Sequence, residues 1–524
     1  MEDRTIHSWV NYTRWRNNHW ARSLIVVLLL LGIFFRFVNL DRKVYWYDET
    51  ITSLRISGYR QTEMIRQVFD GHEVGVEDLQ KYQRISSEKN LIGTAHSLAS
   101  EAPQHPPLYF LLARFWVQYF GYSVEVLRSL SALISLLVFP CLYWLCLELF
   151  NSALVGWLAV ALMSVSPFHV LYAQEAREYS LWTVTILLLS AALLHAMRRN
   201  TKLSWAMYSA ALAVSIYSFT FSLFVAAGQA IYVAVIERFR LTKIAKAYLF
   251  ASLIGALTFT PWLLVIVIHL LVVHELSAWT DFSLPLLTLI KDWSLNFSRI
   301  FIDLNFTNNS SFIYLLVPVI FFEAYSIYFV CRRTPTRIWL FILTLIGVTA
   351  LALVLPDLLL GGQRSSVTRY LIPCYLGVQL AVAYLISTQI VSISSSQQKI
   401  WQVALGILIA GGVMSCTLSS QAEVWWNKYE SCDNPQVAQI VNRANHPLLI
   451  SDSSTGFSNV LSLSYLLVPK VRMQLLVFPN QPKFLDKSYD IFLYKPSDSL
   501  RKQLEKKYKI EFVSKNNDVW KLEY

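Results

Sequence analysis

The sequence predicts a polytopic α-helical membrane protein that carries a small α/β domain at its C-terminal end. Of its 524 residues, 55% are hydrophobic and only 15% are charged, whereas soluble domains are nearer a quarter charged. Apolar runs long enough to span a membrane recur from residue 23 to about residue 418. From about residue 421 the composition changes to that of a soluble domain. We therefore expect a transmembrane domain over residues 1–420 and an α/β domain over residues 421–524.

The first apolar run, residues 23–40, is expected to be a retained membrane anchor. It is too long for a removed signal peptide, and it lacks a small-residue cleavage site. Cytoplasmic flanks of membrane spans carry an excess of Lys and Arg. The arginines before this run, which predict a cytoplasmic N-terminus, are Arg4, Arg14, Arg16 and Arg22. Residues 41–125 should then form a large first loop outside the membrane.

The apolar segment Leu108–Phe120 is expected to be a helix that does not cross the membrane. Its 13 residues give roughly 20 Å of helix, against a hydrocarbon core of roughly 30 Å. Arg114 and Gln118 lie four residues apart and so share one helix face. If this helix lies in the interface, every short basic loop that follows is cytoplasmic, as the positive-inside rule requires. A crossing at this point would turn all of those loops outward.

On this topology the chain crosses the membrane about eleven times, and the tail lies outside. The spans after the first are expected near residues 126–149, 153–172, 179–197, 203–217, 219–236, 249–273, 311–330, 338–355, 370–390 and 400–418. The basic residues that they turn inward are Arg198, Arg199, Lys202, Arg238, Arg240, Lys243, Lys246, Arg332, Arg333 and Arg337. The net charge of +11 thus reflects topology and does not indicate a nucleic-acid partner.

The tail is expected to contain five short strands and two helices. The strands are predicted near residues 447–452, 471–478, 489–495, 510–513 and 519–522. A helix over residues 434–444 opens with Pro435, which suits the first turn. A second helix begins at Ser497, whose side chain can cap it. The tail contains no catalytic signature.

Polar residues of catalytic type gather in three stretches that this topology places on the outer face. An arginine makes bidentate contacts to phosphate, and a carboxylate can take the proton of an attacking hydroxyl. The stretches therefore suit a phosphate-bearing lipid and a hydroxyl acceptor. The first loop supplies Asp48, Glu49 and His105, the turn near residue 175 supplies Gln174, Glu175, Arg177 and Glu178, and the loop before the span at 370–390 supplies Arg364, Arg369 and Tyr370.

Each of these residues also has a purely structural interpretation. Glu175 and Arg177 could pair with each other. Arg364 and Arg369 could be anchors to lipid headgroups, and His105 could be a solvated loop residue. The acidic pair of the first loop could be solvated within a belt of interfacial aromatic residues.

Three motifs appear in a characteristic order. They are Trp-Tyr-Asp-Glu at 46–49, His-Pro-Pro-Leu-Tyr at 105–109, and Ser-Pro-Phe-His at 166–169 running into Gln-Glu-Ala-Arg-Glu-Tyr-Ser-Leu at 174–181. This order resembles the GT-C superfamily of polyprenyl-phosphate-dependent glycosyltransferases. The chain looks most like the bacterial relatives of protein O-mannosyltransferases (glycosyltransferase family 39) and like the lipid A aminoarabinose transferases. The resemblance covers about residues 20–390 and leaves the tail outside the shared core.

The resemblance implies that Asp48 is the general base. It implies that Glu49 supports Asp48, or that both hold a divalent metal where one is used. The aminoarabinose branch has an acid and a lysine before its Pro-Pro, where this chain has Gln104 and His105. The mannosyltransferases place a second acid just before their His-Pro-Pro, where this chain has Pro103 and Gln104. These departures leave the metal requirement open.

The resemblance also implies the residues that bind the lipid phosphate. The His-Pro-Pro element precedes a juxtamembrane helix at the donor site, and Arg177 is a phosphate contact. A late Arg-Tyr pair near the phosphate corresponds to Arg369 and Tyr370. The substrate-binding and phosphate-binding candidates are therefore His105, Glu175, Arg177, Arg364, Arg369 and Tyr370.

The expected function is that of an inverting glycosyltransferase of the plasma or inner membrane, which acts on the outer face. The donor is a polyprenyl-phosphate sugar, and the acceptor hydroxyl belongs to a protein, a lipid or a glycan. Because the lipid phosphate leaves readily, one carboxylate base suffices, unlike the acid and base of glycoside hydrolases. One alternative is a transporter or flippase for a lipid-linked sugar, which would use the same cations without a base. Another is a non-catalytic membrane scaffold that presents the tail.

Overall fold

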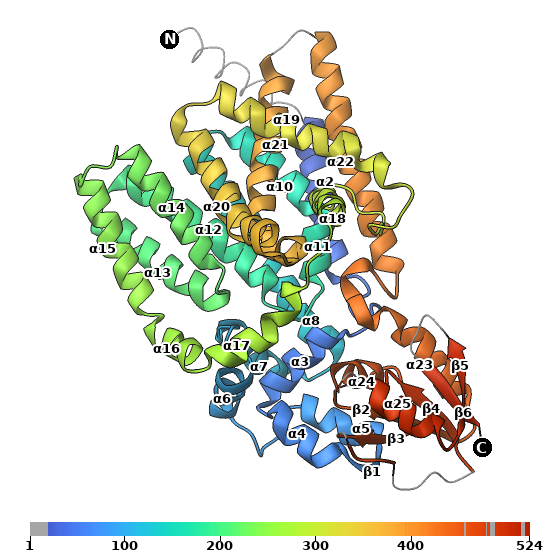
Figure 1. Cartoon of the computed structure of the whole chain (residues 1–524). Coiled ribbons are helices and arrows are strands. Elements are labelled where there is room, and N and C mark those ends of the chain that lie inside the picture. The colour runs from blue at the N-terminus through green and yellow to red at the C-terminus, as the bar shows by residue number, and fades with distance from the viewer. Residues whose placement is uncertain are drawn as a thin grey trace. The chain divides into compact units, whose positions relative to one another are not determined.

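The computed structural model describes residues 19–392, 395–454, 457–477, 479–482, 488–514 and 519–523 (Figure 1). The chain forms two compact units. One unit, which we call the helical unit, comprises the chain up to Val38, Pro103–Leu108 and Ser131–Ser420. The other, which we call the sheet unit, comprises Asn39–Ala102, Tyr109–Leu130 and Gln421–Tyr524. Three of the arginines that predict a cytoplasmic N-terminus, Arg4, Arg14 and Arg16, lie outside the described residues.

The helical unit consists almost entirely of apolar helices. They are α2 (His19–Phe37), α9 (Val138–Phe150), α10 (Ala153–Ser164), α11 (Pro167–Ala173), α12 (Tyr179–Arg199), α13 (Lys202–Ser218), α14 (Ser222–Ile236), α15 (Lys243–Leu257), α16 (Thr260–Ile268), α17 (Leu270–Ser277), α18 (Leu286–Ser298), α19 (Val317–Arg333), α20 (Thr336–Leu360), α21 (Ile372–Ser392) and α22 (Ser395–Gln421). The boundary between the units falls within α8 (Val124–Leu136).

Several of these helices satisfy the requirements of a membrane span. In the described chain, six helical stretches are long and apolar enough to cross a membrane, and the number rises to eight if each bent helix pair is one span. The bent pairs are α10 with α11, at 61°, and α15 with α16, at 54°. A helical chain with several apolar helices of spanning length is therefore confirmed. The expected count of about eleven spans stays a prediction.

The break between α10 and α11 is stabilised by a buried arginine. Arg36 donates from Nη1 to the carbonyl of Ser164 at 2.9 Å and from Nη2 to that of Met163 at 3.3 Å. Carbonyls freed by a break in an apolar surrounding need such donors. Pro167 begins α11, and the hydroxyl of Ser166 donates to the carbonyl of Ile300 at 2.6 Å. The Ser-Pro-Phe-His motif thus bends the chain toward the turn at residues 174–178.

The sheet unit is built around a six-stranded sheet in the order β1-β3-β2-β4-β6-β5. The strand β2 pairs parallel with β3 and β4, and the other pairings are antiparallel. The strands are β1 (Asp70–Gly75), β2 (Pro447–Asp452), β3 (Arg472–Leu476), β4 (Asp490–Tyr494), β5 (Lys509–Ser514) and β6 (Val519–Glu523). The helices are α3 (Tyr47–Ser57), α4 (Gln61–Val68), α5 (Val76–Gln80), α6 (Leu91–Glu101), α7 (Leu108–Phe120), α23 (Asn434–Arg443), α24 (Phe457–Ser464) and α25 (Asp498–Glu505).

The first loop and the tail share this sheet. The edge strand β1, drawn in blue, lies against the red strands of the tail (Figure 1). One hydrophobic core combines Leu54 and Met64 of the first loop with Val460 and Met473 of the tail, all of them buried. The structure has the expected boundary at residue 420, but it places the first loop in the same unit as the tail, because the loop and the tail each cover apolar surface of the other.

The helix α7 has the predicted bounds, and Arg114 anchors it. The buried guanidinium of Arg114 donates to the carbonyls of Ile56 and Lys89 at 2.6 and 2.5 Å and to the hydroxyl of Thr94 at 3.1 Å. The guanidinium is thus hydrogen-bonded inside the sheet unit, while the side chains of Tyr119 and Phe120 remain exposed. This amphipathic arrangement favours the prediction that α7 lies in the membrane interface.

The predicted topology can be tested by cysteine labelling in a background that lacks the six native cysteines. Single cysteines at the exposed Lys202 and Lys243 are expected to react only from the cytoplasmic side, because basic loops stay inside. A cysteine at the exposed Lys502 of α25 is expected to react only from outside. An impermeant maleimide measures the accessible side. Reaction of Lys202→Cys from outside would show that α7 crosses the membrane.

Candidate active site

The acidic pair of the first loop occupies the first turn of α3. Carboxylates are stabilised there by the backbone N–H groups and the helix dipole. Asp48 is half-buried, whereas Glu49 is fully buried. Because neighbouring side chains on a helix point about 100° apart, the two carboxylates have different surroundings. The structure therefore separates two residues that the sequence presents as a pair.

Glu49 belongs to a buried ion pair. Its Oε1 accepts from Nε of Arg128 at 2.7 Å and its Oε2 from Nη2 of Arg128 at 2.6 Å, which is a bidentate contact. Nζ of Lys428 lies 3.4 Å from Oε2. Arg128 also donates to the carbonyls of Leu40, Lys43 and Val44 at 2.6–3.0 Å. Glu49 thus fixes the loop segment that leads to Asp48.

The acidic pair does not fit a shared divalent metal in this arrangement. Both carboxylate oxygens of Glu49 accept hydrogen bonds from Arg128 and are therefore engaged by a cation. Across the ranges that the structure describes, no group of three or more His, Cys, Asp or Glu side chains is placed to hold a metal ion.

The turn between α11 and α12 and the His-Pro-Pro element meet in the helical unit. Nδ1 of His105 lies 2.8 Å from Oε1 of Glu178, and Nη2 of Arg177 lies 3.3 Å from the same oxygen. Trp262 holds the chain just before His105, because its Nε1 donates to the carbonyl of Pro103 at 3.1 Å. Glu178 and Arg177 are buried, and His105 is partly exposed. The predicted phosphate contact Arg177 is therefore paired with Glu178, a polar residue of the same turn to which the sequence assigned no role.

Glu178 is a carboxylate that stays ionised. Burial alone would raise the pKa of Glu178, but the positive charges of Arg177 and His105 lower it to about 2 from its ordinary value of 4.5. A lowered carboxyl pKa contributes stability that is complete above pH 4.5 and is lost as the pH falls toward 2. At neutral pH, the ionised Glu178 therefore orients the side chains of Arg177 and His105 and is too weak a base to take a proton.

Two arginines converge on one aromatic ring. The guanidinium of Arg177 lies 5.7 Å from the ring centroid of Tyr179, and that of Arg369 lies 5.9 Å from the same centroid. Arg369 also lies 5.6 Å from the ring centroid of Tyr370. Both arginines are buried. Guanidinium groups are the side chains that bind phosphate best, so Arg177, which Glu178 orients, and Arg369 are candidate phosphate contacts.

The structure thus brings together most of the predicted phosphate-binding residues, and Arg364 is the exception. Glu175 lies in the same turn and is fully buried. Arg364 forms ion pairs with Asp281 and with Asp357, and its Nη1 lies 3.2 Å from Oδ1 of Asp357. Two carboxylates neutralise this guanidinium, so the arrangement does not support the predicted phosphate contact of Arg364. The acidic pair lies in the sheet unit, and the phosphate-binding candidates lie in the helical unit.

The fold is that of the GT-C glycosyltransferases. The structure of ArnT from Cupriavidus metallidurans bound to undecaprenyl phosphate matches with a TM-score of 0.51 at 12% identity, over 97% of this chain and 98% of that chain. The apo state of the same protein matches with a TM-score of 0.51 at 13% identity, over 96% and 98%. The Archaeoglobus fulgidus oligosaccharyltransferase tethered with an acceptor peptide matches with a TM-score of 0.50 at 12% identity, over 89% and 65%.

Within this class, residues 104–265 match the family model of the dolichyl-phosphate-mannose-protein mannosyltransferases. No curated protein matches the chain. The matched segment contains the His-Pro-Pro element, the Ser-Pro-Phe-His motif and the turn with Arg177 and Glu178. The predicted resemblance to the GT-C superfamily is therefore confirmed.

Proposed function

We propose that the protein is a glycosyltransferase that moves a sugar from a polyprenyl-phosphate donor to an acceptor hydroxyl on the outer face of the membrane. The observation that carries this proposal is the convergence of Arg177 and Arg369 on Tyr179, beside the Glu178–His105 pair. The GT-C fold supports it, since a structure with that fold, ArnT, is bound to undecaprenyl phosphate.

The cations of the helical unit would bind the phosphate of the donor and stabilise it as the leaving group. As the bond between the anomeric carbon and the phosphate oxygen breaks, negative charge grows on that oxygen. Guanidinium groups already fixed by Glu178 and Tyr179 stabilise this charge without further reorganisation. Because the phosphate leaves as an anion, the reaction needs no general acid.

Asp48 would act as the general base. Its carboxylate takes the proton of the acceptor hydroxyl while the oxygen of that hydroxyl bonds to the anomeric carbon. A direct displacement of this kind inverts the configuration of that carbon. Glu49 acts as a positioning residue, since its contacts with Arg128 and Lys428 fix the first turn of α3.

The phosphate contact gives a prediction about donor binding. Arg177→Ala is expected to weaken binding of a polyprenyl phosphate by roughly tenfold to hundredfold, because a hydrogen bond to a charged group contributes about 1.5–3 kcal/mol. Binding of the corresponding polyprenol, which lacks phosphate, should change little. Competition against a labelled polyprenyl phosphate measures both affinities. Arg332→Ala, which removes an exposed arginine at the end of α19, is the matched control, and equal losses for the two lipids would speak for a structural role of Arg177.

A transporter of lipid-linked sugars would use the same cations but would not need Asp48, so the base variant in the Discussion separates the two functions. The scaffold alternative cannot be tested by deleting the tail. That deletion would uncover the apolar core that Leu54 and Met64 share with the tail. A variant that keeps the fold and loses sugar transfer excludes the scaffold instead.

A further inference from the structure

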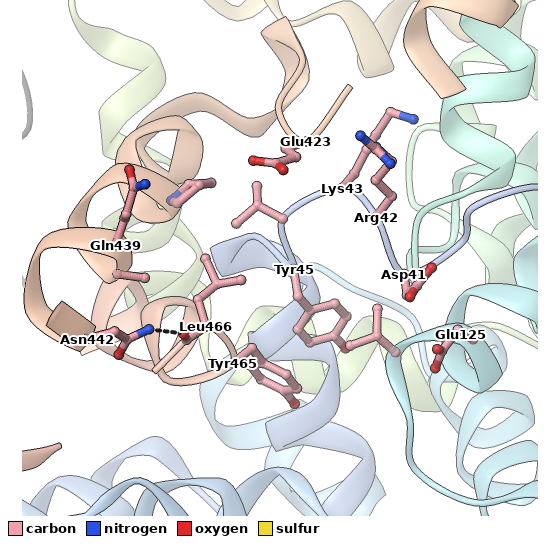
Figure 2. A pocket seen from close by; sticks show the side chains of 14 residues that line it. Asp41, Arg42, Lys43, Tyr45, Glu125, Glu423, Gln439, Asn442, Tyr465 and Leu466 are labelled. Carbon is pink, nitrogen blue, oxygen red and sulfur yellow. Dashed lines mark hydrogen bonds between the residues drawn. The ribbon is translucent and has the colours of Figure 1, made fainter. Parts of the chain in front are cut away.

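The sheet unit contains a cavity of about 580 Å³ that the proposed mechanism does not use. Its wall is formed by the segment that precedes α3, the start of α8, the helix α23, and residues that follow α22 and α24 (Figure 2). Binding sites for small molecules are typically about 300–1,000 Å³. The cavity is therefore large enough for one or two sugar rings.

Two tyrosine rings form the fixed part of the cavity wall. The ring centroids of Tyr45 and Tyr465 lie 4.7 Å apart at an interplanar angle of 53°. The hydroxyl of Tyr45 donates to the carbonyl of Glu49 at 2.9 Å and forms a hydrogen bond of 2.6 Å with the hydroxyl of Ser53. Aromatic rings held in this way offer a rigid surface to the apolar face of a ligand.

Polar groups surround the two rings. Figure 2 shows Gln439 and Asn442 of α23 on one side of the rings and Asp41 and Glu125 on the other. Among the described residues, the side chains of Gln439 and Glu423 make no hydrogen bond and no ion pair with the protein, and both are exposed. An amide that can donate and accept and a carboxylate that can accept are thus available to a ligand.

The charges of the lining nearly balance. Three carboxylates and two cations line the cavity, from Asp41, Glu125, Glu423, Arg42 and Lys43. A phosphate or another anion would meet the carboxylates, and a polycation would meet Arg42 and Lys43. Hydroxyl groups both donate and accept hydrogen bonds. A neutral ligand rich in hydroxyl groups is therefore the best match to this lining.

We propose that this cavity binds a neutral saccharide, and that this saccharide is part of the acceptor. The second half of the proposal rests on the proposed function. Asp48 follows Tyr45 by three residues, which limits the separation of their Cα atoms to about 10 Å. The carbonyl of Glu49 also accepts from the Tyr45 hydroxyl. A saccharide held on Tyr45 would thus lie close to the helix turn that carries Asp48, and we place the acceptor hydroxyl on a sugar attached to it.

The test measures saccharide binding to the full-length protein in a detergent without a sugar headgroup. Saturation-transfer NMR with maltose, cellobiose and diacetylchitobiose gives the affinities, and tetralysine and tetraglutamate serve as charged comparison ligands. Gln439→Trp fills the cavity from an exposed position on α23. Gln436→Trp places the same bulk one turn earlier on α23, at an exposed position outside the cavity lining, and is the matched control.

At least one disaccharide is expected to bind the wild type and Gln436→Trp, and Gln439→Trp should weaken that binding by about tenfold or more. Glu423→Gln, which preserves the size of an exposed side chain, should also weaken disaccharide binding. This variant tests the cavity even if Gln439→Trp does not fold. Binding of none of the disaccharides, equal binding by both tryptophan variants, or preference for a charged peptide would overturn the proposal. The binding assay contains no donor, so its result is independent of sugar transfer. Saccharide binding without sugar transfer would support the saccharide site and refute the proposed function. Sugar transfer without saccharide binding would support the proposed function and refute the saccharide site.

Discussion

Asp48→Asn is expected to lower sugar transfer by roughly 10²–10⁴-fold, which is the usual contribution of general acid–base catalysis. The substitution keeps the size of the side chain and removes the base. Donor binding should be nearly unchanged, because the lost interaction acts mainly in the transition state. The initial rate of transfer from a polyprenyl-phosphate sugar and the affinity for polyprenyl phosphate, measured on the same preparation, separate the two effects.

Asp498→Asn is the matched control, because Asp498 also occupies the first turn of a helix of the sheet unit. It should transfer sugar at the wild-type rate. If Asp48→Asn also transfers at that rate, Asp48 is not the base, and Glu175 becomes the next carboxylate to test, since the low pKa of Glu178 makes it a weak base. A wild type that moves the lipid-linked sugar across the membrane without transferring it would establish the transporter.

Arg128→Ala is expected to destabilise the protein by about 3–5 kcal/mol, the usual cost of breaking a buried ion pair. The substitution leaves the fully buried Glu49 without its bidentate partner and frees the carbonyls of Leu40, Lys43 and Val44. Unfolding of the purified protein by denaturing detergent measures the change. Transfer activity should fall together with stability, whereas Asp48→Asn should lose activity and keep its stability.

The exposed ion pair between Lys509 and Glu511 provides the control for this second prediction. Lys509→Ala should leave the unfolding midpoint unchanged, because exposed ion pairs contribute little. An Arg128→Ala protein that unfolds at the wild-type midpoint would show that the Glu49–Arg128 pair does not hold the first loop. In that case Glu49 would no longer count as a positioning residue for Asp48.

Much of the fold can be predicted from local sequence patterns. The apolar runs predict the helices, and the length and charge of residues 108–120 predict α7 with its bounds. All five predicted strands of the tail are present, β2 with the predicted ends, and Ser497 caps α25 by accepting from the backbone N–H of Leu500 at 3.2 Å. These elements were found because each has its own period or cap in a short window.

The edge strand β1 could not be predicted in this way. Its sequence, Asp-Gly-His-Glu-Val-Gly, is rich in residues that are rare in strands. It is a strand only because β3 pairs with it, and β3 lies about 400 residues further along the chain. The helix α24 was also not predicted from the sequence. The shared core of the first loop and the tail follows from this long-range pairing, which no local pattern records.

The candidate site shows the same limit. The motifs identify Asp48, His105 and Arg177 because their residue types suit the chemistry. Glu49 and Arg364 carry the same types, yet Glu49 pairs with the distant Arg128 and Lys428. Arg364 pairs with the distant Asp281 as well as with the nearby Asp357. Sequence spacing does not record which of these charged side chains a distant partner neutralises.

The pairing of β1 with β3 also bears on how the protein is made. During synthesis the first loop leaves the ribosome early, while its partner strand follows about 400 residues later, a delay of roughly 20–80 s at ordinary translation rates. Throughout this interval Leu54 and Met64 lack the tail residues that later bury them. The nascent loop therefore exposes apolar surface until the tail has been made. A premature stop between residues 422 and 471 would leave every helix of the helical unit intact and still remove the strand that pairs with β1.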